Sequence, residues 1–183
     1  MKPTHFLAAL ACVAATTTAM AEIEKVATTD TGNLSMRWWP KLTPPKGWKH
    51  DRPHSVSYGI NALAPQRGNF GSARTVMYAK AIPKPREPEL KSVEMLMERD
   101  KRKALANNPG VAVASGAPLK TADGKTLPSI TYAPKGEGNW ERVAYGEEGD
   151  FYLLFALSSR TRAGYDGAMK SFEALVGSYR EKP

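Results

Sequence analysis

The sequence predicts an α+β protein in which helices cover an antiparallel sheet. Alternating apolar and polar segments surround a stretch of 20 residues whose apolar positions follow the spacing of a helix. A second helical stretch closes the chain, and residues 151–157 are almost wholly apolar, as in a strand buried on both faces. Because this strand is apolar on both faces, the antiparallel sheet must be covered by helices.

The first half of the chain is expected to supply strands. Prolines and glycines separate short alternating runs, and Val56, Tyr58 and Ile60 share one face of one such run. Pro83 ends the last run of this half. The expected order is a flexible lead-in at 22–33, strands at 34–39, 54–62 and 73–82, and a loop at 64–72.

The second half is expected to place a hairpin sheet between two helices. Pro88 fits the first turn of a helix, which Asn108 and the following Pro-Gly end. Asp123-Gly124 is a hairpin signal, Pro128 weakens the return strand or puts it at an edge, and Thr161 is a plausible N-cap. The expected elements are helices at 88–107 and 161–179 and strands at 111–120, 126–132, 140–145 and 151–157, with a turn at 146–150.

The N-terminus has the pattern of a secretory signal peptide. Lys2 precedes ten apolar residues, too few to span a bilayer, and Ala19-Met20-Ala21 fits signal peptidase cleavage. We therefore expect a signal at 1–21, a single domain at 34–183, and a periplasmic or secreted bacterial protein with no integral membrane segment after cleavage. Cys12, the only cysteine, lies in a poor lipoprotein box, so a lipid anchor there is disfavoured; an uncleaved N-terminal anchor helix is the other alternative.

Positive charge is concentrated in the first half of the predicted mature chain. Ten Lys and Arg residues lie between positions 31 and 86 against one acidic residue, Asp51, whereas the two signs cancel from Glu87 onward. This asymmetry indicates a basic face and an acidic partner, either a protein or an anionic envelope component. The alternative is a generally basic surface without a specific partner. No nucleic-acid recognition motif is present.

Three tryptophans lie within the same basic half. Tryptophan beside basic residues suits a membrane interface, a sugar ring or a protein hot spot, although large side chains also plug the edges of small sheets as core. The candidate partner-binding residues are Arg37, Trp38, Trp39, Trp48, Arg52, Arg67 and Arg74.

Catalytic and metal-binding patterns are weak in this sequence. The mature chain would keep two histidines, His50 and His54, and it has neither a Gly-x-Ser-x-Gly elbow nor a phosphate-loop or His-Glu-x-x-His motif. The run 50–54 holds three metal-capable groups, but Pro53 prevents helical pairing of the histidines. Glu147, with its acidic neighbours, lies in one turn rather than across a cleft. We expect no catalytic residue, metal or cofactor.

The order of elements resembles the PsbP-like fold family, which includes PsbP, the Ran-binding Mog protein and bacterial DcrB-type exported proteins. Four features carry the resemblance: Gly47-Trp48 before the first long strand, the 119–125 segment after the helix, the acidic-glycine turn before 151–157, and the closing segment 171–180. The resemblance implies an α/β/α sandwich around a central antiparallel sheet. It also implies a non-enzymatic binding or assembly role, because members of that family are mostly not enzymes.

We therefore expect an exported, non-catalytic binding or assembly protein. Two alternatives remain open. One is an envelope enzyme that uses His50 or His54 with a carboxylate, and the other is a binder of a small apolar or lipid ligand between sheet and helix. The identity of the partner and the oligomeric state do not follow from the sequence.

Overall fold

A computed structural model describes residues 23–30 and 33–181 of the chain. Nine strands and three α-helices are present among these residues, together with one turn of 3-10 helix, η1. The predicted signal peptide and Cys12 lie outside the described residues. The elements are β1 Ile23–Asp30, β2 Asn33–Pro40, β3 Trp48–His50, α1 Arg52–Tyr58, β4 Asn61–Pro65, β5 Thr75–Pro83, η1 Lys84–Arg86, α2 Val93–Asn107, β6 Ala112–Lys120, β7 Thr126–Ala133, β8 Trp140–Glu148, β9 Phe151–Ser159 and α3 Arg162–Gly177.

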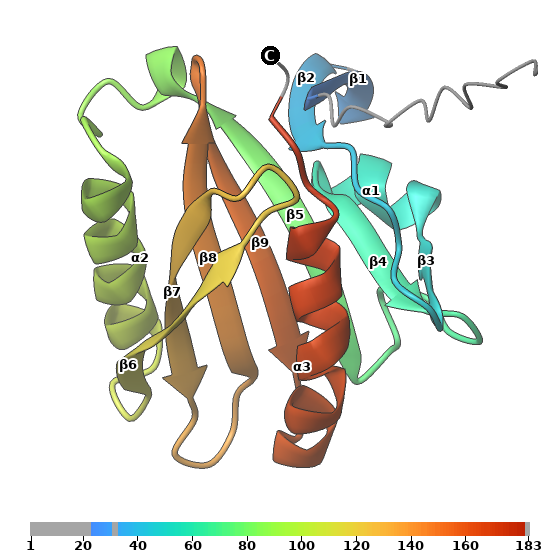
Figure 1. The fold of residues 1–183 in the computed structure, drawn as a ribbon, viewed down its shortest axis with the longest axis vertical. Coiled ribbons are helices and arrows are strands. Elements are labelled where there is room, and N and C mark those ends of the chain that lie inside the picture. The colour runs from blue at the N-terminus through green and yellow to red at the C-terminus, as the bar shows by residue number, and fades with distance from the viewer. Residues whose placement is uncertain (1–22, 31–32, 182–183) are drawn as a thin grey trace, which may run out of the picture.

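The body of the protein is an antiparallel sheet of seven strands in the order β3-β4-β5-β9-β8-β7-β6. In Figure 1 the helix α3 crosses in front of this sheet and α2 lies along its left side. The strand β9 pairs with β5 on one side and β8 on the other, so it occupies the centre. The prediction of an α+β protein with a helix-covered antiparallel sheet is confirmed.

Each face of the sheet has its own apolar core. Under α3, the fully buried Phe172 and Leu175 pack against Phe155 of β9. Under α2, Leu96 packs with Tyr145 and Tyr152 on the opposite face. Alternate residues of β9 therefore enter different cores, which explains why this strand is apolar at nearly every position.

The prediction of a strand at 54–62 is wrong. Residues 52–58 form the short helix α1, because Asp51 caps its first turn by accepting from the His54 amide at 3.3 Å, and Pro53 supplies a helical φ. Gly59 ends the helix with φ +64°, a left-handed conformation that glycine adopts at little cost. The next strand, β4, begins only at Asn61.

The prediction of a flexible lead-in at 22–33 is also wrong over most of its length, because residues 23–30 form a strand. Residues 23–30 form β1, which pairs along its whole length with β2 in an antiparallel hairpin. Its polar residues conceal the alternation, although Val26 is buried. In Figure 1 the hairpin lies at the upper right, beside α1 and the upper end of β5.

The remaining boundaries follow the predictions closely. The first long helix ends at Asn107 as expected, but begins at Val93 rather than Pro88, because Ser92 caps the Met95 amide. The Asp123-Gly124 hairpin and the Thr161 cap are confirmed. Pro128 lies inside an internal strand, where it faces the irregularity between Gly116 and Leu119 of β6. No helix among the described residues is long and apolar enough to cross a membrane.

Candidate functional site

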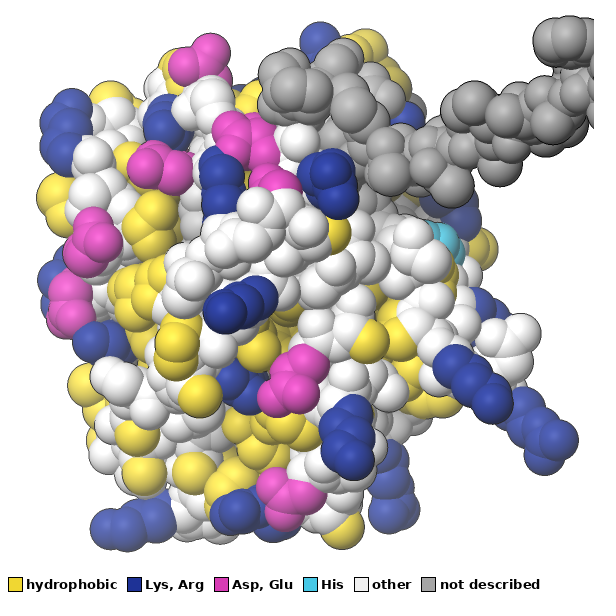
Figure 2. Space-filling view, viewed as in Figure 1, with side chains coloured by type: hydrophobic (Ala, Val, Ile, Leu, Met, Phe, Trp, Pro, Cys, Tyr) yellow, Lys and Arg dark blue, Asp and Glu magenta, His cyan; other side chains and the backbone are white. Residues whose placement is uncertain are grey.

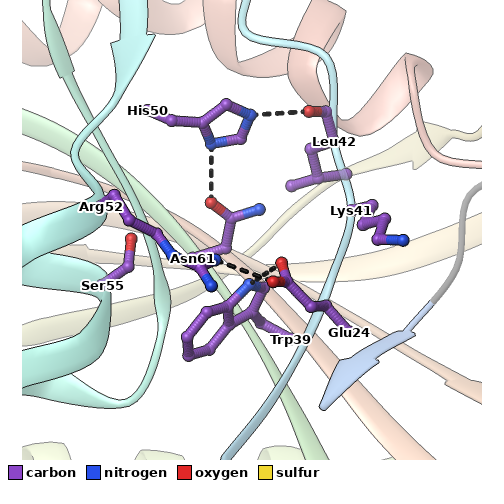
Figure 3. A pocket seen from close by; sticks show the side chains of 8 residues that line it. All are labelled: Glu24, Trp39, Lys41, Leu42, His50, Arg52, Ser55 and Asn61. Carbon is purple, nitrogen blue, oxygen red and sulfur yellow. Dashed lines mark hydrogen bonds and ion pairs between the residues drawn. The ribbon is translucent and has the colours of Figure 1, made fainter. Parts of the chain in front are cut away.

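The structure divides the candidate partner-binding residues between the two ends of β5. Arg74 precedes this strand, and Trp48, paired with Pro65, lies at the same end with the loop that carries Arg67. The strand has nine residues, so its ends are about 30 Å apart at a rise of roughly 3.3 Å per residue. The β1–β2 hairpin packs at the far end, with Arg37, Trp38 and Trp39. Figure 2 shows blue side chains projecting at the lower right, while magenta side chains lie over other parts of the face in view.

Two pockets flank strand β2. The larger, of about 410 Å³, is lined by Trp39, Arg52 and His50 among others. The smaller, of about 160 Å³, is lined by Arg37 and Trp38. Neighbouring tryptophans of the same strand thus contribute to different pockets, as the alternation of a strand requires.

The polar groups of the larger pocket are mostly bound to one another or to the backbone. The His50 ring lies between the Asn61 amide oxygen and the Leu42 carbonyl oxygen, with both distances 2.9 Å. The Asn61 amide nitrogen donates to the Pro40 carbonyl at 2.9 Å, and the Ser55 hydroxyl is bonded to two backbone groups. These bonds tie the end of β2 to β3, α1 and β4.

Trp39 acts as a core residue in this pocket. Its side chain is 1% exposed, so a partner cannot reach the ring. The indole N–H donates to Glu24 at 3.0 Å, and Arg52 bonds the other oxygen of the same carboxylate at 2.9 Å while lying over the ring. These contacts of Trp39, Glu24 and Arg52 attach the hairpin to the body of the protein.

The smaller pocket brings together three cations from three elements. Arg37 comes from β2, Lys80 from β5 and Arg86 from η1, and all three line the same space. Neither Arg37 nor Lys80 forms an ion pair with another described residue, whereas Arg86 donates to the Met36 carbonyl at 3.3 Å. We call this site the three-cation pocket.

One carboxylate, Glu87, also lines the three-cation pocket. It is already engaged, because Arg99 donates to it at 2.7 Å. Burial, and next the neighbouring Arg37, hold the pKa of the Lys80 ammonium below its usual value, although Glu87 and Asp100 act in the opposite direction. The pocket thus keeps an excess of positive charge in a partly desolvated place.

Two neighbours lie against the arginine side chains of the three-cation pocket. Arg86 lies 4.5 Å from the centre of the Trp38 ring, a cation–π contact, and Trp38 is half-buried against Phe151 at 6.4 Å. Arg37 passes over Gly59, where a Cβ atom would lie 2.7 Å from its Cδ. Trp38 is therefore a support for a cation rather than an open stacking surface.

The sequence analysis counted Lys80 and Arg86 among the basic residues of the first half but did not include them among the candidate partner-binding residues. Lys80 stands between Ala79 and Ala81 in an otherwise apolar strand, and a lone lysine in such a strand is the signal that could have singled it out. The convergence with Arg37 depends on packing of β2 beside β5, more than 40 residues away in the chain.

The two histidines, His50 and His54, have different hydrogen-bond partners. The His54 ring donates to the buried Asp51 carboxylate at 2.9 Å and stacks on Tyr58. Its other ring nitrogen lies close to Gly71, where a Cβ would be 2.7 Å away. In the described part of the chain, no group of three His, Cys, Asp or Glu residues is placed to hold a metal ion.

No known protein-family model matches this chain, and no curated protein is similar enough in sequence to be counted as related.

Proposed function

We propose that this chain is an exported, non-catalytic binding or assembly protein of the bacterial cell envelope, which docks an acidic protein or anionic envelope component through the three-cation pocket. The observation that carries this proposal is the excess of positive charge lining one small pocket. Arg37 and Lys80 have no ion pair with another described residue, and the Glu87 carboxylate is bound by Arg99. An acidic group on a partner would supply the missing counter-charge.

The arrangement of the pocket supports recognition rather than nonspecific attraction. Arg86 is held by Trp38 and by a backbone carbonyl, so little side-chain freedom would be lost on binding. The Arg37 side chain passes close to Gly59. All of these cations are exposed, but Arg67 and Arg74 at the other end of β5 line neither of these pockets.

The envelope location in this proposal rests on the signal pattern of residues 1–21. Expression of the full chain in a bacterial host should yield a periplasmic protein that begins at Glu22. Mass spectrometry of the envelope fraction measures this directly. Retention of an unprocessed chain in the cytoplasm would contradict the location.

Two matched triple variants test the binding surface. The first changes the pocket (Arg37→Glu, Lys80→Glu and Arg86→Glu) and the second changes the opposite end (Lys46→Glu, Arg67→Glu and Arg74→Glu). Both variants change the formal net charge by the same amount, from +8 to +2. Thermal unfolding and circular dichroism would first establish that each variant is folded.

Binding would be measured to labelled poly-glutamate, as an acidic protein, and to phosphatidylglycerol vesicles, as an anionic envelope component. We expect the wild type and the second variant to bind at least one probe and the pocket variant to lose it. Binding should weaken as the salt concentration rises from 50 to 500 mM, because the Debye screening length falls from about 14 Å to about 4 Å. Equal binding by the two folded variants, or no binding to any anionic probe, would refute the proposal.

A further inference from the structure

We infer that the three-cation pocket takes one tetrahedral oxyanion, a phosphate monoester group, as its specific ligand. This inference rests on the proposed function and narrows it. It follows from the number, type and placement of the donors rather than from net charge.

The donors that line the site come from three separate elements. Strand β2 supplies Arg37, β5 supplies Lys80, and η1 supplies Arg86. A carboxylate is planar, and one arginine can bind both of its oxygens with two parallel hydrogen bonds in that plane. Two guanidinium groups and one ammonium group from separate elements suit a ligand whose oxygens point in several directions, as those of a phosphate do.

The charge of the site favours a dianion over a carboxylate. Three cations meet one carboxylate, Glu87, which Arg99 already holds. The lining residues therefore carry an excess of two positive charges, while outside the lining Arg99 also lies 3.7 Å from Glu89 and from Asp100. A phosphate monoester carries close to two negative charges at neutral pH, and so neutralises the remaining excess where a carboxylate would leave half of it.

The size of the pocket fits a single phosphate group. Its volume of about 160 Å³ corresponds to roughly five water molecules at about 30 Å³ each. That space is large enough for a phosphate group. The ligand would thus insert its phosphate and leave the remainder at the surface. Met36 and Pro83 at the pocket wall offer apolar contact to a short linking chain.

Titration calorimetry with inorganic phosphate, sulfate and acetate tests this inference. The protein used is the exported product of the full chain. We expect phosphate to bind at least tenfold more tightly than acetate. Lys80→Gln and Arg37→Gln should each weaken phosphate binding by about tenfold or more, the effect of removing one charge-assisted hydrogen bond. Arg67→Gln, at the far end of β5, should leave it unchanged. Because these changes are small and at partly exposed positions, unfolding temperatures would identify any variant that does not fold.

Two further probes distinguish the source of the phosphate. One is O-phosphoserine, a soluble monoester, and the other is phosphatidylcholine vesicles with and without phosphatidic acid. Displacement of inorganic phosphate by phosphoserine alone indicates a soluble or protein-borne phosphate, and binding to the phosphatidic acid vesicles indicates a lipid headgroup.

Several results would overturn the inference. Acetate that binds as tightly as phosphate, phosphate binding unaffected by Lys80→Gln and Arg37→Gln, or absence of phosphate binding to the folded wild type would each do so. If poly-glutamate still bound in a pocket-dependent manner, the inference alone would fail and the proposed function would stand. If no anionic probe bound, both would fail.

Discussion

Replacing Asp51 by alanine should destabilise the protein by about 2–4 kcal/mol. The carboxylate is 7% exposed and accepts hydrogen bonds from the Phe70 amide at 2.7 Å and from the His54 amide and ring. Loss of an N-cap costs about 1 kcal/mol. The Phe70 amide, left without its acceptor in a part-buried place, adds about 1–3 kcal/mol.

The same replacement should lower the unfolding temperature by about 10 °C, at roughly 2–4 °C per kcal/mol for a protein of this size. Differential scanning calorimetry and urea unfolding measure the change. Asp166→Ala is the matched control, because its carboxylate is 54% exposed and pairs with Arg162 on one face of α3. The control should cost about 0.3–0.5 kcal/mol. A loss below about 0.5 kcal/mol for Asp51→Ala, equal to that control, would refute the role assigned to this cap.

The effect of Asp51 should also depend on pH in a stated direction. Burial raises the pKa of the Asp51 carboxyl, but the hydrogen bonds from Phe70 and His54 outweigh burial, so the pKa in the folded protein lies below its usual value. The contribution is then fully present above about pH 4, the ordinary pKa, and is lost as the pH falls through the lower folded value. The difference between wild type and Asp51→Ala should shrink over that acidic range.

Three further variants test separate parts of the account. Gly59→Ala should weaken phosphate binding several-fold, because its Cβ would displace Arg37, whereas Gly124→Ala, with a similar φ and open space, should alter stability alone; calorimetry compares them. Phe172→Ala should cost about 3–5 kcal/mol in urea unfolding, because the fully buried ring fills the core under α3; a loss under 1 kcal/mol would contradict that packing. Trp39→Phe should cost about 1 kcal/mol by removing the donor to Glu24; an unchanged urea midpoint would show that this bond contributes nothing.

Most of the sheet was readable from the sequence because its strands are locally marked. The apolar run of β9 and the Asp123-Gly124 turn each specify their structure within a few residues. The error at 54–62 arose where alternation competed with capping. Asp51 and Gly59 bracket seven residues with an N-cap and a left-handed C-cap, and these end signals decided the conformation.

The candidate site was less predictable because its cations meet through tertiary packing. The sequence located the basic half and selected Arg37 and Trp38, which do line the three-cation pocket. It also selected Arg67 and Arg74, which lie before β5, about one strand length away from the three-cation pocket. Proximity in sequence was thus a poor guide to proximity in space, since the ends of one extended strand are as far apart as the chain allows.

The central claim, that the three-cation pocket binds a phosphate-type anion, can be tested by following arginine side-chain N–H resonances during a phosphate titration. Resonances assigned to Arg37 and Arg86 should shift together and saturate, whereas those of Arg67 and Arg74 should stay in place. Equal, non-saturating shifts at all four arginines would show that phosphate only screens surface charge, and would contradict the claim.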